Sequence, residues 1–347
     1  MTRELVSVII PTYNRAGLCK KAVDSVLRQT YSNVEVIVVD DGSIDNTCEL
    51  ISRIDPRVKY IRQENAGVSA ARNTGLKNAQ GTFIALLDSD DEWLEWKLEM
   101  QMLTLEHFPE AGMVWTDMKA VNEKDEVIAE TYLKTMYSAY RLFDWDMAGK
   151  RRLKLTDIWG CCPSKYADRE CVYGNIFRWM FNGNLVHTST VLLRRERLKF
   201  VGGFDTSLLK SGEDYDFHLR TCMHGDVAYV DVSSINYRIG AADQLTAEKY
   251  WIWLARNNLK TVEKILTMIE GRITFPDTVV RNRLAESHAW VGYCEIFENN
   301  GRARRHLLES LRRNPIQGKA MFYILLTLFP SELLQKIRYI KRYVFNT

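Results

Sequence analysis

Strands and helices alternate through the first 116 residues of this 347-residue chain, and this alternation limits the fold more than any other feature. Residues 5–10 (LVSVII), 34–39 (VEVIVV) and 82–87 (TFIALL) are nearly continuous apolar runs. Segments with apolar residues at helical spacing lie between them, as in residues 15–29. Continuous apolar strands separated by helices are typical of a parallel sheet that helices cover on both faces. The sequence therefore predicts an α/β fold with a mostly parallel, Rossmann-like sheet.

The pattern changes after residue 117. Residues 118–186 are rich in Tyr, Trp, Cys and charge with weak periodicity, and we interpret them as excursions around a site rather than as core. Apolar runs at 188–198 and within 226–239 predict a strand and two closing strands. From Thr246 to the end the pattern is helical. We predict one domain over residues 1–240, in halves 1–116 and 117–240, and a helical region over 241–347.

Composition excludes some classes of protein. The net charge is only +3, so nothing global indicates a nucleic-acid partner. Seven cysteines, an odd number without regular spacing, favour a reducing compartment, and Cys161, Cys162 and Cys171 lack the spacing of a zinc site. The N-terminus reads as a first strand rather than a signal peptide, and no run reaches the roughly 18–20 apolar residues of a spanning helix. We expect a cytoplasmic protein, at most peripheral on the inner face of the membrane.

The C-terminal segment is basic and amphipathic. From Gly301 to the end there are ten Lys and Arg residues against two Glu. Residues 331–347 place Lys and Arg among regularly spaced Leu, Ile and Val, a pattern that suits an anionic membrane interface. The same apolar stripe could equally pack on the preceding helices or on a second subunit in a homo-oligomer.

Polar residues follow three of the apolar runs. In an open α/β sheet, ligands bind outside the carboxyl ends of the strands, so these residues are the candidates for a binding site. The run at 5–10 is followed by Pro11, Thr12, Tyr13, Asn14 and Arg15. The run at 34–39 is followed by residues 40–43, and the run at 82–87, the fourth predicted strand, by residues 88–91. A planar heterocycle could stack on Tyr13, and a carboxylate such as Asp40 could accept a hydrogen bond from a ring N–H, which suits uracil.

The acidic cluster of Asp88, Asp90, Asp91 and Glu92 needs a reason, because like charges so close together repel. A divalent cation bridged to a diphosphate would neutralise the carboxylates. Two alternatives stay open: the cluster could cap the following helix, and Asp-Gly-Ser after the second strand could be only a turn.

Four sequence blocks resemble the inverting family 2 nucleotide-sugar glycosyltransferases, which have the GT-A fold. The blocks are VSVIIPTYNR, VIVVDDGSIDNT, ENAGVSAARNTGLKNAQGTFIALLDSDD and VGGFDTSLLKSGEDYDFHLR. The first three cover residues 6–91 almost continuously and the fourth covers 201–220, whereas 118–186 and the helical tail carry no such match. The resemblance implies a nucleotide-sugar-binding half over 1–116 and an acceptor-side half over 117–240.

The resemblance also implies roles for individual residues. A nucleotide-sugar donor, UDP-linked in our prediction, would be contacted by Pro11, Thr12, Tyr13, Asn14, Arg15, Asp40, Arg72, Asp88 and Ser89. Asp90 would be the principal ligand of Mn²⁺ or Mg²⁺, with Asp88 beside it. Glu213 would lie on the acceptor side and Asp214 would be the general base toward a glycan or lipid-linked acceptor, in bacterial surface-polysaccharide or glycolipid synthesis.

The base has a physical rationale of its own. Inverting transfer needs a carboxylate that takes the proton of the attacking hydroxyl while a cation stabilises the departing diphosphate. Glu213 and Asp214 raise each other's pKa, which is useful in a base, although the N-terminus of the helix that they begin opposes this shift. The alternative is that this pair only caps the helix.

Other residues allow two interpretations each. His187 could touch the acceptor or the diphosphate, but we favour a structural role, and we expect His218 to be a packing residue. The aromatic residues between 132 and 182 could form a sugar-stacking cleft or fill an irregular region.

Two other protein classes would show different sequence features. A nucleotide-dependent oxidoreductase predicts a Gly-rich turn after the first strand, where this chain has PTYNRAG. A non-catalytic nucleotide-sugar-binding or scaffolding protein would have lost the metal acid or the base, and this chain retains both Asp90 and Asp214.

Overall fold

The apolar runs near the N-terminus form neighbouring parallel strands in a computed structural model, which describes residues 4–240, 244, 247–330 and 333–334. Strand β1 (Val6–Thr12) pairs in parallel with β2 (Val34–Asp40) and β4 (Phe83–Leu86), and β2 pairs with β3 (Val58–Arg62). All of β1 is buried, as its apolar sequence requires. Thr12 lies opposite Asp40 in the register, so the polar residues that follow both strands meet at one edge.

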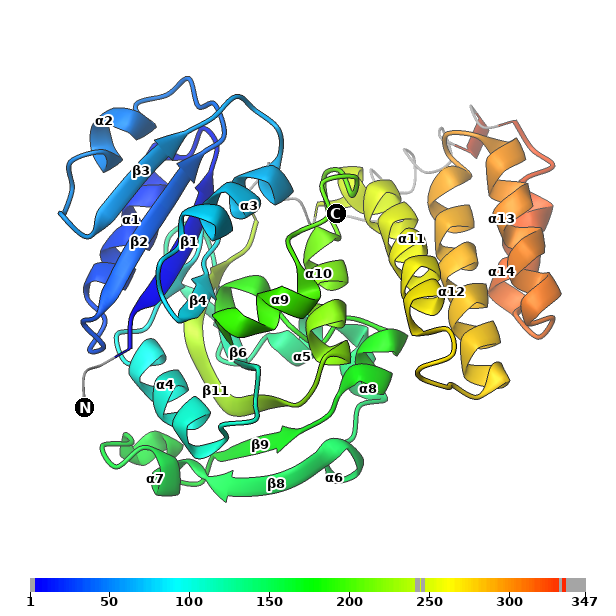
Figure 1. The fold of residues 1–347 in the computed structure, drawn as a ribbon. Helices are drawn as coiled ribbons and strands as arrows, with labels where there is room; N and C mark the ends of the chain where they lie inside the picture. Colours follow the sequence, from blue (N-terminus) through cyan, green and yellow to red (C-terminus); the bar gives the residue numbers. More distant parts are fainter. Residues whose placement is uncertain (1–3, 241–243, 245–246, 331–332, 335–347) are drawn as a thin grey trace. The chain divides into compact units, whose positions relative to one another are not determined.

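The remaining strands extend this sheet in the order β3-β2-β1-β4-β10-β6-β11-β9-β8 (Figure 1). They are β6 (Met113–Val121), β8 (Gly149–Lys154), β9 (Glu170–Gly174), β10 (Leu192–Arg194) and β11 (Val227–Arg238). The short strands β5 (Glu92–Trp93) and β7 (Val127–Ala129) pair with β11 and β6. The result is a mixed sheet whose first four strands in this order are parallel, as predicted.

Our interpretation of residues 118–186 as excursions outside the core was wrong in part. Strand β9 pairs antiparallel with β11, β8 pairs with β9, and Cys171 in β9 is fully buried (Figure 1). Strand β8 (GKRRLK) lies at the sheet edge with mostly exposed side chains. Charged residues are common on such edges. Because β8 contains no apolar run, the sequence pattern did not predict it as a strand.

Two strand predictions need adjustment. The strand expected over residues 188–198 is only Leu192–Arg194, because 3₁₀ turns occupy Thr188–Thr190 and Arg195–Arg197. The two closing strands expected within 226–239 are one continuous strand, β11, whose register against β6 shifts twice. Such irregularities bend a strand and explain why one strand looked like two.

Helices connect these strands, and the longer ones occur where the helical periodicity predicts them. They are α1 (Ala16–Leu27), α3 (Val68–Asn78), α4 (Lys97–His107) and α10 (Glu213–Met223). Shorter helices are α2 (Thr47–Ile51), α5 (Leu133–Met136), α6 (Trp145–Ala148), α7 (Leu155–Ile158), α8 (Phe177–Asn182) and α9 (Leu198–Val201). Helix α3 packs on β1 and β2 and thereby carries Arg72 to the sheet.

The chain divides into two units by its contacts. The first contains Met1–Leu208 and Glu213–Gln244, and the second contains Leu209–Gly212 and Leu245–Thr347. A functional boundary after residue 240 stays a prediction.

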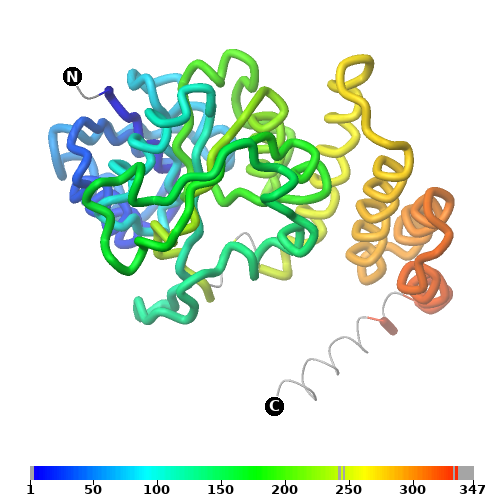
Figure 2. The backbone as a smooth tube through the Cα atoms, turned by 90° about the horizontal axis from the view of Figure 1, so that it is seen from below, coloured from blue at the N-terminus to red at the C-terminus, as the bar shows by residue number. Residues whose placement is uncertain are grey.

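The second unit is helical in its described part. Its helices are α11 (Trp251–Ile269), α12 (Asp277–Glu295), α13 (Asn300–Arg313) and α14 (Gly318–Leu326), and each packs on the next (Figure 2). Most of the predicted basic amphipathic segment, 331–347, lies outside the described residues.

Gly75 allows α3 to approach β1 closely. A Cβ atom at this position would lie 2.3 Å from Cγ2 of Ile9, so we expect Gly75→Ala to lower the free energy of unfolding by about 1–3 kcal/mol. Gly17 in α1 is the matched control, because nothing lies within 4 Å of its Cβ position, and Gly17→Ala should stabilise by up to about 1 kcal/mol. Urea unfolding of both variants measures the difference, and equal effects would contradict this packing.

Candidate active site

The loops after β1 and β2 are fastened to each other. The backbone N–H of Asn14 donates to Oγ of Ser43 at 2.8 Å, and Ile44 N–H donates to Oδ1 of Asn14 at 2.8 Å. Asn14 holds a left-handed backbone with φ of 52°, which Asn tolerates better than most residues. This turn leaves the Tyr13 side chain 48% exposed at the edge of the sheet, available to a planar ligand.

Asp40 is buried at the end of β2, with both carboxylate oxygens engaged. Its Oδ1 accepts from Ser43 N–H at 2.7 Å, and its Oδ2 accepts from the hydroxyl of Tyr60. A carboxylate oxygen has two lone pairs, so a ring N–H of a base would share an oxygen that already accepts one hydrogen bond. Asp40 therefore shapes the turn beside Tyr13, whatever further contact it makes.

Arg72 links three elements that are distant in the sequence. Its Nη1 donates to Oε1 of Glu213 at 2.6 Å and its Nη2 donates to Oδ1 of Asp88 at 2.7 Å, although 141 residues separate Arg72 from Glu213. The guanidinium also lies 5.0 Å from the ring centre of Phe204 and is almost fully buried. Helix α3, the end of β4 and the start of α10 are thus held together by one charged side chain.

The loop before α3 places Arg72. Asp41 accepts hydrogen bonds from Nε2 of Gln63 at 2.7 Å, from Ala66 N–H at 3.0 Å and from Gly67 N–H at 2.8 Å. Gly67 has a φ of 89°, which glycine adopts without strain, directly before the helix. A carboxylate after β2 therefore fixes where α3 begins.

The VGGF segment, residues 201–204, also serves this placement. Asn73 exchanges two hydrogen bonds with the backbone of Phe204, at 2.7 and 2.8 Å. A Cβ atom on Gly203 would lie 2.5 Å from Oδ1 of Asn73, so only glycine permits this approach. The segment thus carries the ring that lies against Arg72.

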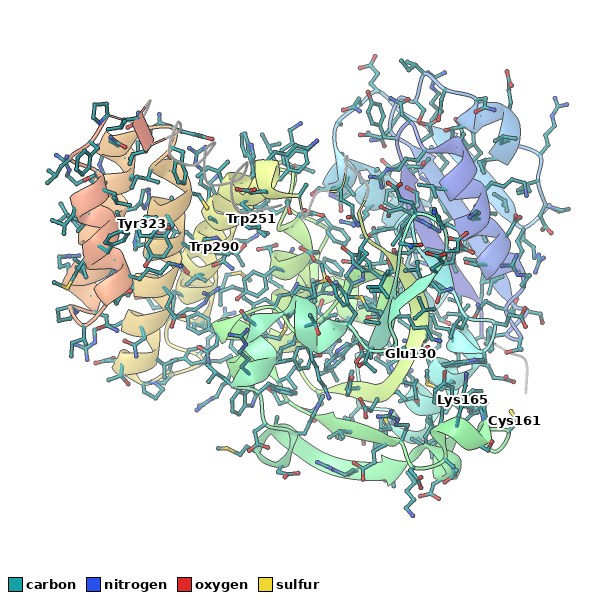
Figure 3. The ribbon with its side chains drawn as sticks, turned by 180° about the vertical axis from the view of Figure 1, so that it is seen from behind. Glu130, Cys161, Lys165, Trp251, Trp290 and Tyr323 are labelled. Atoms are coloured by element: carbon teal, nitrogen blue, oxygen red, sulfur yellow. The ribbon has the colours of Figure 1, made fainter. Side chains whose placement is uncertain are left out.

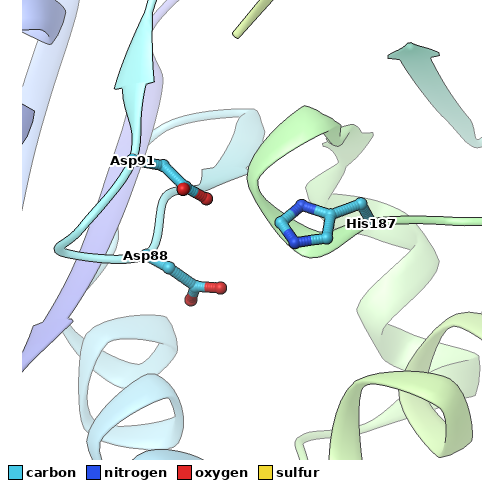
Figure 4. A group of neighbouring side chains, drawn as sticks. All are labelled: Asp88, Asp91 and His187. Atoms are coloured by element: carbon cyan, nitrogen blue, oxygen red, sulfur yellow. The ribbon is translucent and has the colours of Figure 1, made fainter. Parts of the chain in front are cut away.

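The acids after β4 take separate partners. Asp90, the predicted principal metal ligand, forms an ion pair with Arg15 at 2.8 Å. Asp88, Asp91 and His187 instead offer ligand atoms that all lie within 4.8 Å of one another, and they form the one such group found in the described part of the chain. Figure 4 shows their side chains directed toward a common space. The structure therefore gathers Asp88 with two residues that were not predicted as ligands.

His187 has the protonation state of a metal ligand. Burial lowers its pKa to about 4, although Asp88 opposes the shift, so the imidazole is neutral at pH 7. Its Nδ1 is buried and has no hydrogen-bond partner among the described residues. Neutral imidazole and carboxylate oxygens together suit Mn²⁺ or Mg²⁺, so these side chains fit the predicted cation.

The two carboxylates of this group differ in electrostatics. Burial alone would raise the pKa of Asp88, but the guanidinium of Arg72 holds it below its ordinary value. The pKa of Asp91 is raised well above its usual range by burial and by Asp90 and Asp88. Asp91 also accepts from Oγ of Ser189 at 2.6 Å. Asp88 is thus more readily ionised than Asp91, and Asp91 has more to gain from a nearby cation.

Asp214 lies at the second position of α10, beside the Arg72 network. Burial and the neighbouring charge of Glu213 raise the pKa of Asp214 to about 7, and Tyr215 N–H donates to its Oδ1 at 2.8 Å. Oε2 of Glu213 is buried without a partner among the described residues, whereas its Oε1 accepts from Arg72. A carboxyl group with a pKa near neutrality is suited to act as a general base.

Other features lie apart from this cluster. Cys161 is exposed in the turn after α7 and belongs to no metal-ligand group in the described residues (Figure 3). An open groove of about 1380 Å³ lies at the start of β4 instead of its end, lined among others by Glu4, Tyr31 and Thr82. It contains none of the predicted site residues.

Sequence reasoning missed Asp91, His187 and Tyr60. Asp91 belongs to the same acidic run as Asp88 and could have been included on that ground. His187 precedes a strand that enters the sheet beside β4, and recognising that β10 neighbours β4 would have placed it there. Tyr60 carries no signal in the sequence, because its pairing with Asp40 depends on the β2–β3 register.

The fold and this edge of carboxylates define the class of open α/β proteins, in which ligands bind at the strand ends. Residues 7–164 match the family model described as glycosyl transferase family 2. The chain is 33% identical over 165 residues to glycosyltransferase GlyA of Streptococcus pneumoniae, which covers 45% of this chain and 24% of that protein. These matches identify residues 7–164 as a glycosyltransferase family 2 segment.

The match to a second relative covers fewer residues. The chain is 50% identical over 100 residues to the UDP-Glc:alpha-D-GlcNAc-diphosphoundecaprenol beta-1,3-glucosyltransferase WfgD of Escherichia coli, covering 28% of this chain and 40% of WfgD. The chain spans only 15% to 24% of the length of four other curated relatives that it matches.

Solved structures support the fold. The crystal structure of S. aureus TarS 1–349 has a TM-score of 0.56 and 18% identity, covering 89% of this chain and 81% of that one. The same protein in complex with UDP-GlcNAc gives a TM-score of 0.52 over 92% of this chain and 89% of that one, at 17% identity. The predicted GT-A α/β class with a C-terminal helical region is confirmed.

Removing the Arg72 side chain should be costly. We expect Arg72→Met to lower the free energy of unfolding by about 3 kcal/mol or more, because Glu213 would be left buried and unpaired. Adding Glu213→Gln should recover at least about 1 kcal/mol in a double-mutant cycle. Arg152→Met is the control, since Arg152 forms only exposed ion pairs and should cost less than about 1 kcal/mol. Equal losses for both arginines would contradict the structural role of Arg72.

Proposed function

We propose that this chain transfers a sugar from a UDP-linked donor to an acceptor hydroxyl with inversion at the anomeric carbon. The observation that carries the proposal is a carboxyl group with a pKa near 7, Asp214, beside the ion pairs that join Arg72 to Asp88 and Glu213. The names of WfgD and of the TarS complex with UDP-GlcNAc support a UDP-linked donor. Tyr13 and Asp40 at the ends of β1 and β2 would receive the uridine, with Pro11, Thr12, Asn14, Arg15 and Ser89 around the nucleotide.

Inversion follows from a single displacement. The acceptor oxygen forms a bond to the anomeric carbon as the bond from that carbon to the diphosphate oxygen breaks. The acceptor proton passes to the carboxylate of Asp214, and the electron pair of the broken bond leaves with UDP. Asp214 must be deprotonated beforehand, and a pKa of about 7 leaves a large ionised fraction at neutral pH while keeping the group basic. Glu213 holds the helix N-terminus in place through Arg72.

A divalent cation fits this site. Asp88, Asp91 and His187 would hold Mn²⁺ or Mg²⁺, and Asp90 could join them by exchanging its ion pair with Arg15. Bound there, the cation would stabilise negative charge on the leaving diphosphate. The adjacent carboxylates would then no longer repel, which accounts for the acidic cluster after β4.

The proposed acceptor is a glycan carried on a lipid, in bacterial surface-polysaccharide or glycolipid synthesis on the cytoplasmic face of a membrane. The name of WfgD, which acts on a diphosphoundecaprenol-linked sugar, supports this acceptor class. Among the described helices none is long and apolar enough to span a bilayer.

The cation site can be tested without turnover. We expect Mn²⁺ to raise the thermal stabilisation by UDP in the native chain, and Asp88→Asn or His187→Ala to weaken the Mn²⁺-dependent affinity by about 10–100-fold. Asp90→Asn should weaken it as well if Asp90 leaves Arg15 for the cation. His107→Ala is the control, because His107 is exposed on α4. An unchanged Mn²⁺ effect in the Asp88 and His187 variants would refute this cation site.

The base can be tested through pH. The rate should fall as pH drops below about 7, because protonated Asp214 cannot accept the acceptor proton. Asp214→Asn should abolish transfer while UDP still binds. Glu213→Gln should move the acid limb of kcat/KM to lower pH, since the Glu213 charge raises the Asp214 pKa. Persistent transfer by Asp214→Asn, or an acid limb near pH 4 in the native chain, would place the base elsewhere.

A further inference from the structure

Helix α14 is apolar on two faces. Its inner face packs on protein: Ala320 is fully buried, and Tyr323 and Leu326 lie against a cluster of Ile296, Ala303 and Leu334. Its outer face and the turn that follows expose Met321 (54%), Phe322 (57%), Leu325 (59%), Leu328 (69%) and Phe329 (50%). A helix that is apolar all round is normally covered, so this outer face is unusual for an isolated protein surface.

The exposed residues are close together along the chain. Met321, Phe322 and Leu325 lie at positions i, i+1 and i+4 of α14, the spacing that collects side chains on one side of a helix. Leu328 and Phe329 follow in the next turn, where their N–H groups donate to the carbonyl oxygens of Leu325 and Leu326. We call these five side chains the α14 apolar face. Exposed apolar patches of this kind mark binding surfaces for proteins or membranes.

Polar contacts on the inner side hold α14 in place. Arg304 of α13 donates to the carbonyl oxygen of Thr327 at 2.8 Å and to its Oγ1 at 3.0 Å. The ring of Tyr323, labelled in Figure 3, lies 4.5 Å from that of Tyr293, and Nζ of Lys319 lies 4.6 Å from the centre of the Tyr293 ring. The α14 apolar face is therefore presented by an anchored helix rather than by a loose segment.

The charge of the segment that contains α13 and α14 favours one kind of partner. Between residues 300 and 330 there are six Lys and Arg residues and one acid, Glu309. Arg302, Arg305 and Lys319 are exposed. A two-fold contact with a second copy would bring two positively charged surfaces together, whereas an anionic lipid surface would neutralise them.

We propose that the α14 apolar face binds the interface of an anionic membrane. Phe322, Phe329 and their apolar neighbours enter the boundary between headgroups and acyl chains, while exposed Arg and Lys side chains meet lipid phosphates. The inference deepens the proposed function and rests on it. Docking would be useful because it would bring the chain to the proposed lipid-linked acceptor. It differs from a membrane role for residues 331–347, since the described residues of α14 carry it.

The test is binding of the whole chain to vesicles. Flotation with equal parts of phosphatidylglycerol and phosphatidylcholine should recover the native chain, and pure phosphatidylcholine should recover much less. The double variant Phe322→Ser, Phe329→Ser should bind phosphatidylglycerol vesicles about tenfold or more weakly. The matched control is Val127→Ser, Ile128→Ser, which removes two exposed apolar side chains from β7 and should bind as the native chain does.

A charge variant covers the case in which the Phe variant fails to fold. Arg302→Gln, Arg305→Gln changes only exposed side chains and should weaken binding to phosphatidylglycerol vesicles by about tenfold. Stabilisation by UDP should be unchanged in every variant, so a failure of this proposal is separable from a failure of the proposed function. Equal vesicle binding by all variants would overturn the membrane proposal. The proposal would also be overturned if the native chain did not bind vesicles and light scattering showed a dimer that the Phe variant dissociates.

Discussion

The two ion pairs of Arg72 are the interaction on which the site depends. A guanidinium is costly to bury unless it is fully compensated, and Arg72 is compensated by Asp88 at the end of β4 and by Glu213 at the start of α10. Replacing such an arrangement with apolar side chains would often be no less stable, so stability alone does not account for it. Its consequence is positional: it holds the acidic strand end and the helix that carries Asp214 in one fixed relation.

The environment then assigns different behaviour to neighbouring carboxylates. Arg72 keeps Asp88 ionised, whereas burial and like charges raise the pKa values of Asp91 and Asp214. His187 is kept neutral by burial. The cluster thus combines an ionised acid and a neutral imidazole, which suit a cation, with a separate carboxyl group that titrates near neutrality, which suits proton transfer. Division of roles by environment is how one site can hold a metal and a base together.

The sequence predicted the parts of this arrangement that local patterns determine. Apolar runs located β1, β2 and β4, and ligands of an open α/β sheet bind outside the carboxyl ends of its strands, so the strand-end residues were expected at one edge. Edge strand β8 was missed because its exposed charges mask the alternation. His187 and the Arg15–Asp90 pair were missed for a different reason, since both depend on the order of strands and on long-range side-chain contacts. The run AMFYILLTLF is strongly apolar in the sequence, but which of its side chains are exposed depends on how α14 packs on its neighbours.

Crystals soaked with UDP and Mn²⁺ would test the central claim most directly, through the anomalous diffraction of manganese. We expect one strong anomalous peak in the space bounded by Asp88, Asp91 and His187, with the diphosphate between it and Asp214 and the uracil beside Tyr13. A manganese peak bound to UDP elsewhere, for example in the groove lined by Glu4 and Tyr31, would contradict a shared site for cation, donor and base.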